Sequence, residues 1–132
     1  MIECALNLGL NQLTHIDMYA NEAMFKSDEF FEMFTQLLLN NQSQIKQLKV
    51  GGNLLNESQS ATILRILSES SMQTLEHLDI SNSDLSSEES HICLAALIVA
   101  APALKYVDVS YQEGRHVYVV IEVEYATEDS DG

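Results

Sequence analysis

Hydrophobic residues recur with the same spacing in four stretches of the chain. The stretches are LTHIDMYANEAM from Leu13, IKQLKVGGNLL from Ile45, LEHLDISNSDL from Leu75 and LKYVDVSYQEG from Leu104, and their starts are 32, 30 and 29 residues apart. Each stretch has apolar residues at its first, fourth and sixth positions, with polar residues between them. This alternation predicts short strands with one buried and one open face. The predicted core residues are Leu13, Ile16, Met18, Ile45, Leu48, Val50, Leu75, Leu78, Ile80, Leu104, Val107 and Val109.

A helical pattern follows each of the first three strands. The first two helices are expected after Ser27 and Asn56, which are good N-cap residues. The third is expected to open at Ser86, with Glu89 at the spacing of a capping box, and to end at Pro102, which cannot continue a helix. Each unit therefore consists of a strand, a turn and a helix. The aromatic stripe in the first helix, formed by Phe30, Phe31 and Phe34, is assigned to the core.

This unit resembles the leucine-rich repeat family, in its long, ribonuclease-inhibitor-like class with a helix in each repeat. The resemblance extends over residues 13–111 and implies a short α/β solenoid, with a curved parallel sheet and helices on its convex side. The family's turn Asn, at the ninth position, is Asn21 and Asn53 here but Ser83 and Gln112 in the last two units. We expect weaker bonds to the turn backbone in those two units. An ordinary α/β domain with a parallel sheet is the alternative architecture.

The sequence predicts a different structure at each end of the repeat domain. MIECALNLGLNQ aligns without gaps with the helical ICLAALIVAAPA, so we expect the chain to start within the helix of a partial repeat, as a cap or as a piece of a larger assembly. The β-prone residues Val117 to Tyr125 follow Val109 too closely for a helix to intervene. We predict that they fold back as an antiparallel strand that caps the sheet edge. The predicted domain is residues 1–125, followed by a disordered acidic tail at 126–132.

The charge of the chain narrows the choice of partners. Six Lys and Arg oppose twenty Asp and Glu, for a net charge of −14. A surface of this sign repels nucleic acid and anionic membranes and favours a basic protein as the partner.

The N-terminus lacks the positive charge of a signal peptide, and the apolar run from Ile92 to Ala101 is shorter than the about 20 residues that span a bilayer. These features predict an intracellular, cytoplasmic protein. Cys4 and Cys93 are read as buried thiols of a reducing compartment, although a disulfide is left open.

The open face of the predicted sheet carries the candidate binding residues. These concave-face candidates are His15, Asp17, Tyr19, Lys49, His77, Asp79, Ser81, Tyr106, Asp108, Ser110 and Tyr111. On neighbouring strands about 5 Å apart, Lys49 would lie between Asp17 and Asp79 and pair with them. The face is either a solvated surface with weak ion pairs or a recognition surface with tyrosine anchors.

His77, Asp79 and Ser81 contain the residue types of a hydrolase, but their order does not suit one. A nucleophile relay needs the His between the Ser and the acid, whereas Asp79 lies in the middle here, with about 6.6 Å between residues two apart on a strand. His15 and His77 lie two strand spacings apart, on the order of 10 Å, so we expect no shared metal. We predict no catalytic residue, no cofactor and no metal.

The expected function is a non-catalytic protein–protein interaction module that binds through its concave face, either alone or as a subunit of a larger complex. The resemblance also implies an alternative, a GTPase-activating regulator of a small GTPase, because this class includes acidic-tailed activators of the Ran GTPase. The arginines available for that role are Arg65, expected on the outer helix layer, and Arg115. A bacterial effector that binds a host protein is a further alternative.

Overall fold

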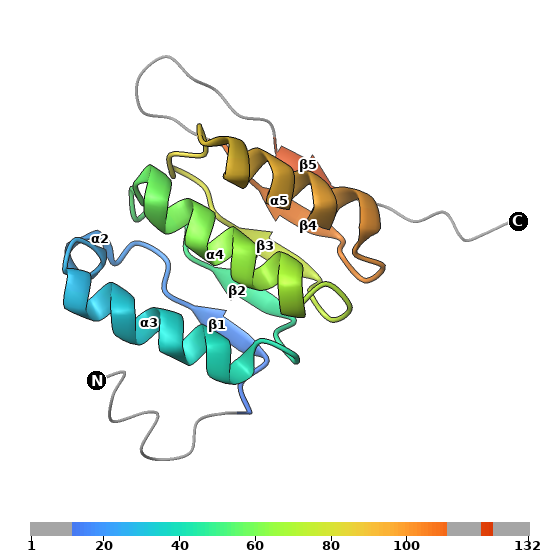
Figure 1. Cartoon of the computed structure of the whole chain (residues 1–132), viewed down its shortest axis with the longest axis horizontal. Helices are drawn as coiled ribbons and strands as arrows, with labels where there is room; N and C mark the ends of the chain where they lie inside the picture. Colours follow the sequence, from blue (N-terminus) through green and yellow to red (C-terminus); the bar gives the residue numbers. More distant parts are fainter. Residues whose placement is uncertain (1–11, 111–119, 123–132) are drawn as a thin grey trace, which may run out of the picture.

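Strands and helices alternate along the chain (Figure 1). The computed structural model describes residues 12–110 and the backbone of residues 120–122. The strands are β1 (His15–Asp17), β2 (Gln47–Lys49), β3 (His77–Asp79), β4 (Tyr106–Asp108) and β5 (Val120–Glu122). The helices are α2 (Glu22–Phe25), α3 (Asp28–Asn41), α4 (Glu57–Ser70) and α5 (Glu88–Ala100).

The strands form one sheet in the order in which they occur in the chain, β1-β2-β3-β4-β5. β1 to β4 pair in parallel, and the fourth-position residues Ile16, Leu48, Leu78 and Val107 are partners from strand to strand. The predicted α/β class with a parallel sheet is therefore confirmed. β5 pairs antiparallel with β4 and includes three residues of the predicted final strand. The remainder of that strand, the acidic tail, the N-terminal partial repeat and Cys4 lie outside the described residues.

Helices α3, α4 and α5 cover one face of the sheet (Figure 1). The alternation of the strands explains this layering, because their fourth-position side chains point to the helix side and are at most 5% exposed. Most of the predicted strand core is buried; Leu13 and Met18 are only partly buried. None of the described helices is long and apolar enough to cross a bilayer.

Local side-chain bonds determine where α3 and α4 begin. The Ser27 hydroxyl accepts the Phe30 N–H at 3.2 Å, as expected of the predicted cap. α4 begins with a reciprocal capping box that was not predicted: Asn56 Oδ1 accepts the Gln59 N–H at 2.8 Å, and Gln59 Oε1 accepts the Asn56 N–H at 3.0 Å.

The predicted start of α5 is wrong by one residue. Ser87, not Ser86, is the N-cap, and its hydroxyl accepts the Ser90 N–H at 3.0 Å. The Ser86 hydroxyl is occupied in the preceding turn, where it donates to Asp84 Oδ1 at 2.6 Å. The capping box that was expected between Ser86 and Glu89 is therefore not formed.

The eighth position of each described repeat has a left-handed backbone. The φ angles are 59° at Ala20, 74° at Gly52 and 55° at Asn82. Gly and Asn are the residues that adopt this conformation most readily. Ala20 is the exception, since its Cβ costs about 1–2 kcal/mol there.

Replacing Ala20 by Gly is expected to raise the free energy of unfolding by about 0.5–1 kcal/mol, because relief of this strain exceeds the entropy cost of a glycine. Urea unfolding followed by circular dichroism measures the change. Asn82→Gly is the matched control and should alter the stability less. A destabilised Ala20→Gly protein would contradict the assignment.

Candidate functional site

The helices lie on one side of the sheet, and we call its other side the open face (Figure 1). The third- and fifth-position side chains of β1 to β4 point to the open face, because they alternate with the buried fourth-position residues. It consists of His15, Asp17, Gln47, Lys49, His77, Asp79, Tyr106 and Asp108, all exposed or half-buried. Equal positions of neighbouring strands are paired in register, so these residues form two rows across the sheet. Gln47 belongs to this face although it was not among the predicted candidates.

The fifth-position row runs Asp17, Lys49, Asp79, Asp108, as the repeat spacing predicted. The expected ion pairs of Lys49 are not formed, because among the described residues Lys49 makes no ion pair. Like-charged Asp79 and Asp108 are direct partners on β3 and β4. The row therefore keeps an excess of negative charge on the open face.

Backbone groups, rather than Lys49, hold these carboxylates. In each of the three units with Asp at the fifth position, Oδ1 accepts the N–H two residues further along. The pairs are Asp17 with Tyr19, Asp79 with Ser81 and Asp108 with Ser110, each at 3.0 Å. A carboxylate has two acceptor oxygens, so this bond orients the group and, in Asp17 and Asp79, leaves the second oxygen for an external donor. The Asp residues thus form the turn and also place negative charge on the face.

Ser81 does not belong to the accessible surface, and this corrects its prediction as an outward binding residue. Only 5% of it is exposed. The reason is Gly51 on the neighbouring strand turn: a Cβ there would lie 2.4 Å from Ser81 Oγ and 2.3 Å from Asp79 Oδ1. These side chains therefore fill the space that the missing side chain leaves. The sequence signal for this arrangement is a glycine at the seventh position, where Tyr19 and Ser110 stand in other units.

Aromatic side chains flank the acidic row. The rings of His77 and Tyr106 pack at 4.4 Å between centroids, inclined by 34°. The Tyr106 hydroxyl donates to Asp108 Oδ2 at 3.5 Å. At the other end of the sheet, Tyr19 is 53% exposed. Tyr106 therefore lies on the same face as the carboxylates, whereas Tyr19 follows β1 in the turn, where its N–H bonds Asp17. Tyr111 lies outside the described residues. Ser110 is half-buried and donates its hydroxyl to Asp108 Oδ1 at 2.7 Å.

The environment of His77 predicts a pH dependence. Burial, followed by the positive charge of Lys49, lowers the pKa of His77 below its usual value, and the carboxylates of Asp79 and Asp108 only partly offset this. Because the unfolded chain takes up the proton more readily, the stability that neutral His77 contributes is complete above about pH 6.5 and decreases as the pH falls below it. Melting temperatures of wild type and His77→Gln between pH 5 and 8 measure the effect. Gln is the residue that β2 carries at this position, and the substitution should flatten the profile; an unchanged profile would contradict the prediction.

Of the two arginines available for the GTPase-regulator alternative, Arg115 lies outside the described residues and Arg65 is paired with a carboxylate. Arg65 lies on α4 in the helix layer, as expected, and its Nη1 is 2.8 Å from Glu89 Oε2 on α5. The hydrogen bond to Glu89 raises the pKa of Arg65. Arg65 is therefore bound to a carboxylate on the side of the molecule opposite the open face.

Two further observations concern chemistry within the described residues. No group of three or more His, Cys, Asp and Glu side chains there lies close enough together to hold a metal ion. Cys93 is a buried free thiol on α5.

No protein-family model matches the chain, and neither a curated protein nor a solved structure is significantly similar to it.

Proposed function

We propose that the chain is a short leucine-rich-repeat solenoid that binds a protein partner through the open face and does not catalyse a reaction. The supporting observation is the register of β1 to β4, which places two rows of polar and aromatic side chains on the sheet side away from the helices. In this proposal the antiparallel β5 acts as the C-terminal cap, since it covers the edge of β4.

The chemistry of the open face favours a basic partner. Its fifth-position row has three carboxylates against one ammonium group, and the whole chain has a net charge of −14. Such a field accelerates encounter with positively charged proteins. The carboxylates are oriented by backbone bonds before binding, so less side-chain entropy is lost when a partner binds.

A photo-crosslinking residue tests the binding face. It replaces Tyr19, which neighbours Asp17 of the open face, in one variant and Leu39 on α3 in another, because both are exposed, at 53% and 39%. Irradiation in extract of the source cells should attach one reproducible protein to the Tyr19 variant and not to the Leu39 variant. Attachment only from α3, or none from the open side at low or high salt, would refute the proposal.

A charge variant then tests how the partner is held. Asp79→Asn with Asp108→Asn keeps an oxygen that can accept the backbone N–H but removes both charges. The variant should lose most of the crosslinked product at low salt. Glu32→Gln, an exposed change on α3, is the matched control and should leave the yield unchanged.

A further inference from the structure

Helix α5 is apolar on its outward side as well as on its core side. Cys93 and Leu97 are buried against the sheet, whereas Ile92 is 61% and Val99 is 84% exposed. Ala95, between them, is also exposed. Residues three, four and seven apart share one face of a helix, so Ile92, Ala95 and Val99 form one outward stripe, which we call the α5 stripe. A helix that is apolar on all sides is typical of a buried environment.

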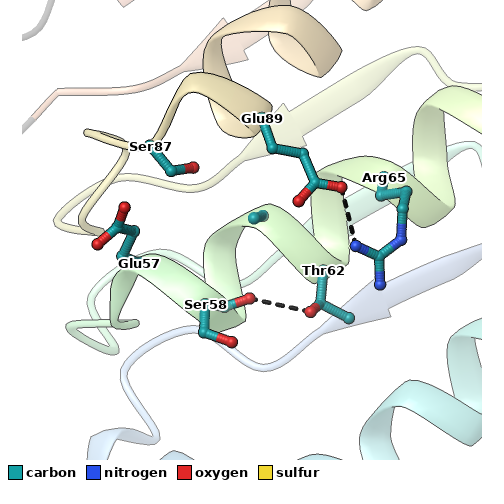
Figure 2. A pocket seen from close by; sticks show the side chains of 7 residues that line it. Glu57, Ser58, Thr62, Arg65, Ser87 and Glu89 are labelled. Atoms are coloured by element: carbon teal, nitrogen blue, oxygen red, sulfur yellow. Dashed lines mark hydrogen bonds and ion pairs between the residues drawn. The ribbon is translucent and has the colours of Figure 1, made fainter.

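An acidic groove lies between the first half of α4 and the start of α5 (Figure 2). Its volume is about 300 Å³, and it is lined by Glu57, Ser58, Ala61, Thr62, Arg65, Ser87 and Glu89. Arg65 is the cation of this groove and is paired with Glu89. Glu57 makes no ion pair among the described residues, so the groove keeps a net negative charge. Ile92 lies three residues after Glu89 on α5, which places the groove less than one helical turn from the stripe.

We propose that the α5 stripe and the acidic groove form a second docking surface, separate from the open face, for a basic amphipathic helix of a partner protein. Apolar residues of that helix, spaced by three, four and seven positions, pack on Ile92 and Val99, and the small side chain of Ala95 allows close approach. A Lys or Arg at the end of the partner's apolar face reaches the carboxylate of Glu57.

Charge complementarity selects this occupant over the others. A second copy of the chain would bring another net charge of −14, and a second acidic groove, against the first. The N-terminal stretch MIECALNLGL is apolar but contains Glu3 and no Lys or Arg, so it offers no cation for Glu57. A basic partner helix supplies both the apolar face and the charge.

Two synthetic peptides test this surface on the full chain. Both are helical 15-residue peptides of Lys and Leu with the same composition; one has its leucines on a single face, and the other is scrambled. Fluorescence anisotropy should show the striped peptide binding about ten-fold more tightly than the scrambled one. Ile92→Gln with Val99→Gln should abolish this preference, and Glu57→Gln should weaken binding of the striped peptide several-fold. The three residues are exposed, so the variants should remain folded by circular dichroism.

Matched variants separate this surface from others. Leu39→Gln and Glu32→Gln, both exposed on α3, should leave the preference unchanged. Asp79→Asn with Asp108→Asn should also leave it unchanged, whatever the outcome of the crosslinking on the open face. Equal binding of the two peptides, a preference that survives loss of the stripe, or one that disappears with the Asp variant would overturn the proposal. A dimer in sedimentation velocity that the stripe variant dissociates would assign the stripe to a second copy and overturn it as well.

Discussion

Replacing Asn53 by Ala is expected to lower the free energy of unfolding by about 3 kcal/mol. Asn53 is 1% exposed and bonds three backbone groups. Its Nδ2 donates to the carbonyl oxygens of Met18 at 2.9 Å and Val50 at 2.8 Å, and its Oδ1 accepts the Asn21 N–H. Alanine would leave all three groups buried or half-buried without this partner, at about 1 kcal/mol or more each. Urea unfolding at a fixed pH measures the loss.

The third repeat provides the control for Asn53. Ser83 occupies the same position, is 2% exposed, and its hydroxyl donates, within residues 12–110, to the Ser81 carbonyl oxygen alone, at 3.5 Å. Ser83→Ala should therefore cost less than about 1 kcal/mol. The contrast follows the expectation that the turn bonds weaken where the repeat lacks Asn. Similar losses in the two units would show that the side-chain bonds are not what stabilises the turn.

Replacing Phe34 by Ala is expected to cost about 4 kcal/mol, the largest effect of a single substitution predicted for this chain. Phe34 is fully buried, and its ring lies 5.1 Å from that of Phe25 in an edge-to-face arrangement and 6.3 Å from that of Phe30. Alanine would remove these contacts and leave a cavity in the core beside Phe25 and Phe30. Because domains are commonly stable by about 5–15 kcal/mol, much of this margin would be lost. A thermal melt should show a correspondingly lower midpoint.

Phe34→Leu is the control, because it keeps a buried apolar side chain at this position and removes only part of its volume. It keeps most of the apolar contact and should cost about 1–2 kcal/mol. Phe30→Ala removes a half-buried ring of the same cluster and should cost less than Phe34→Ala. A Phe34→Ala protein within about 1 kcal/mol of wild type would show that the aromatic cluster is not part of the cooperative core.

Much of the fold follows from local patterns of the chain. The apolar first, fourth and sixth positions predict the strands, and a common spacing brings equal positions into register; Leu48 and Leu78 are partners for this reason. The caps at Ser27 and Asn56 are bonds within one helical turn, so their residue types are sufficient to predict them. The parallel sheet, its helix layer and the row of Asp17, Lys49 and Asp79 could therefore be predicted from the sequence.

The accessibility and pairing of the same residues depend on neighbouring units, and a strand pattern does not contain that information. Alternation places Ser81 outward, but the space above Gly51, 30 residues earlier in the chain, accommodates it and buries it. The repeat spacing places Lys49 between the carboxylates of Asp17 and Asp79. Each carboxylate instead accepts the backbone N–H two residues further along, and Lys49 forms no ion pair within the described residues. The sequence of α5 is apolar on every side from Ile92 onward and does not indicate which side is covered, whereas packing in the tertiary structure covers the side of Cys93 and Leu97 and leaves Ile92 and Val99 exposed. The sequence by itself thus determined the periodic frame and its register, because those follow from local side-chain alternation. The tertiary structure decided which polar groups remain available and which apolar face is left uncovered, because both depend on contacts between residues far apart in the chain.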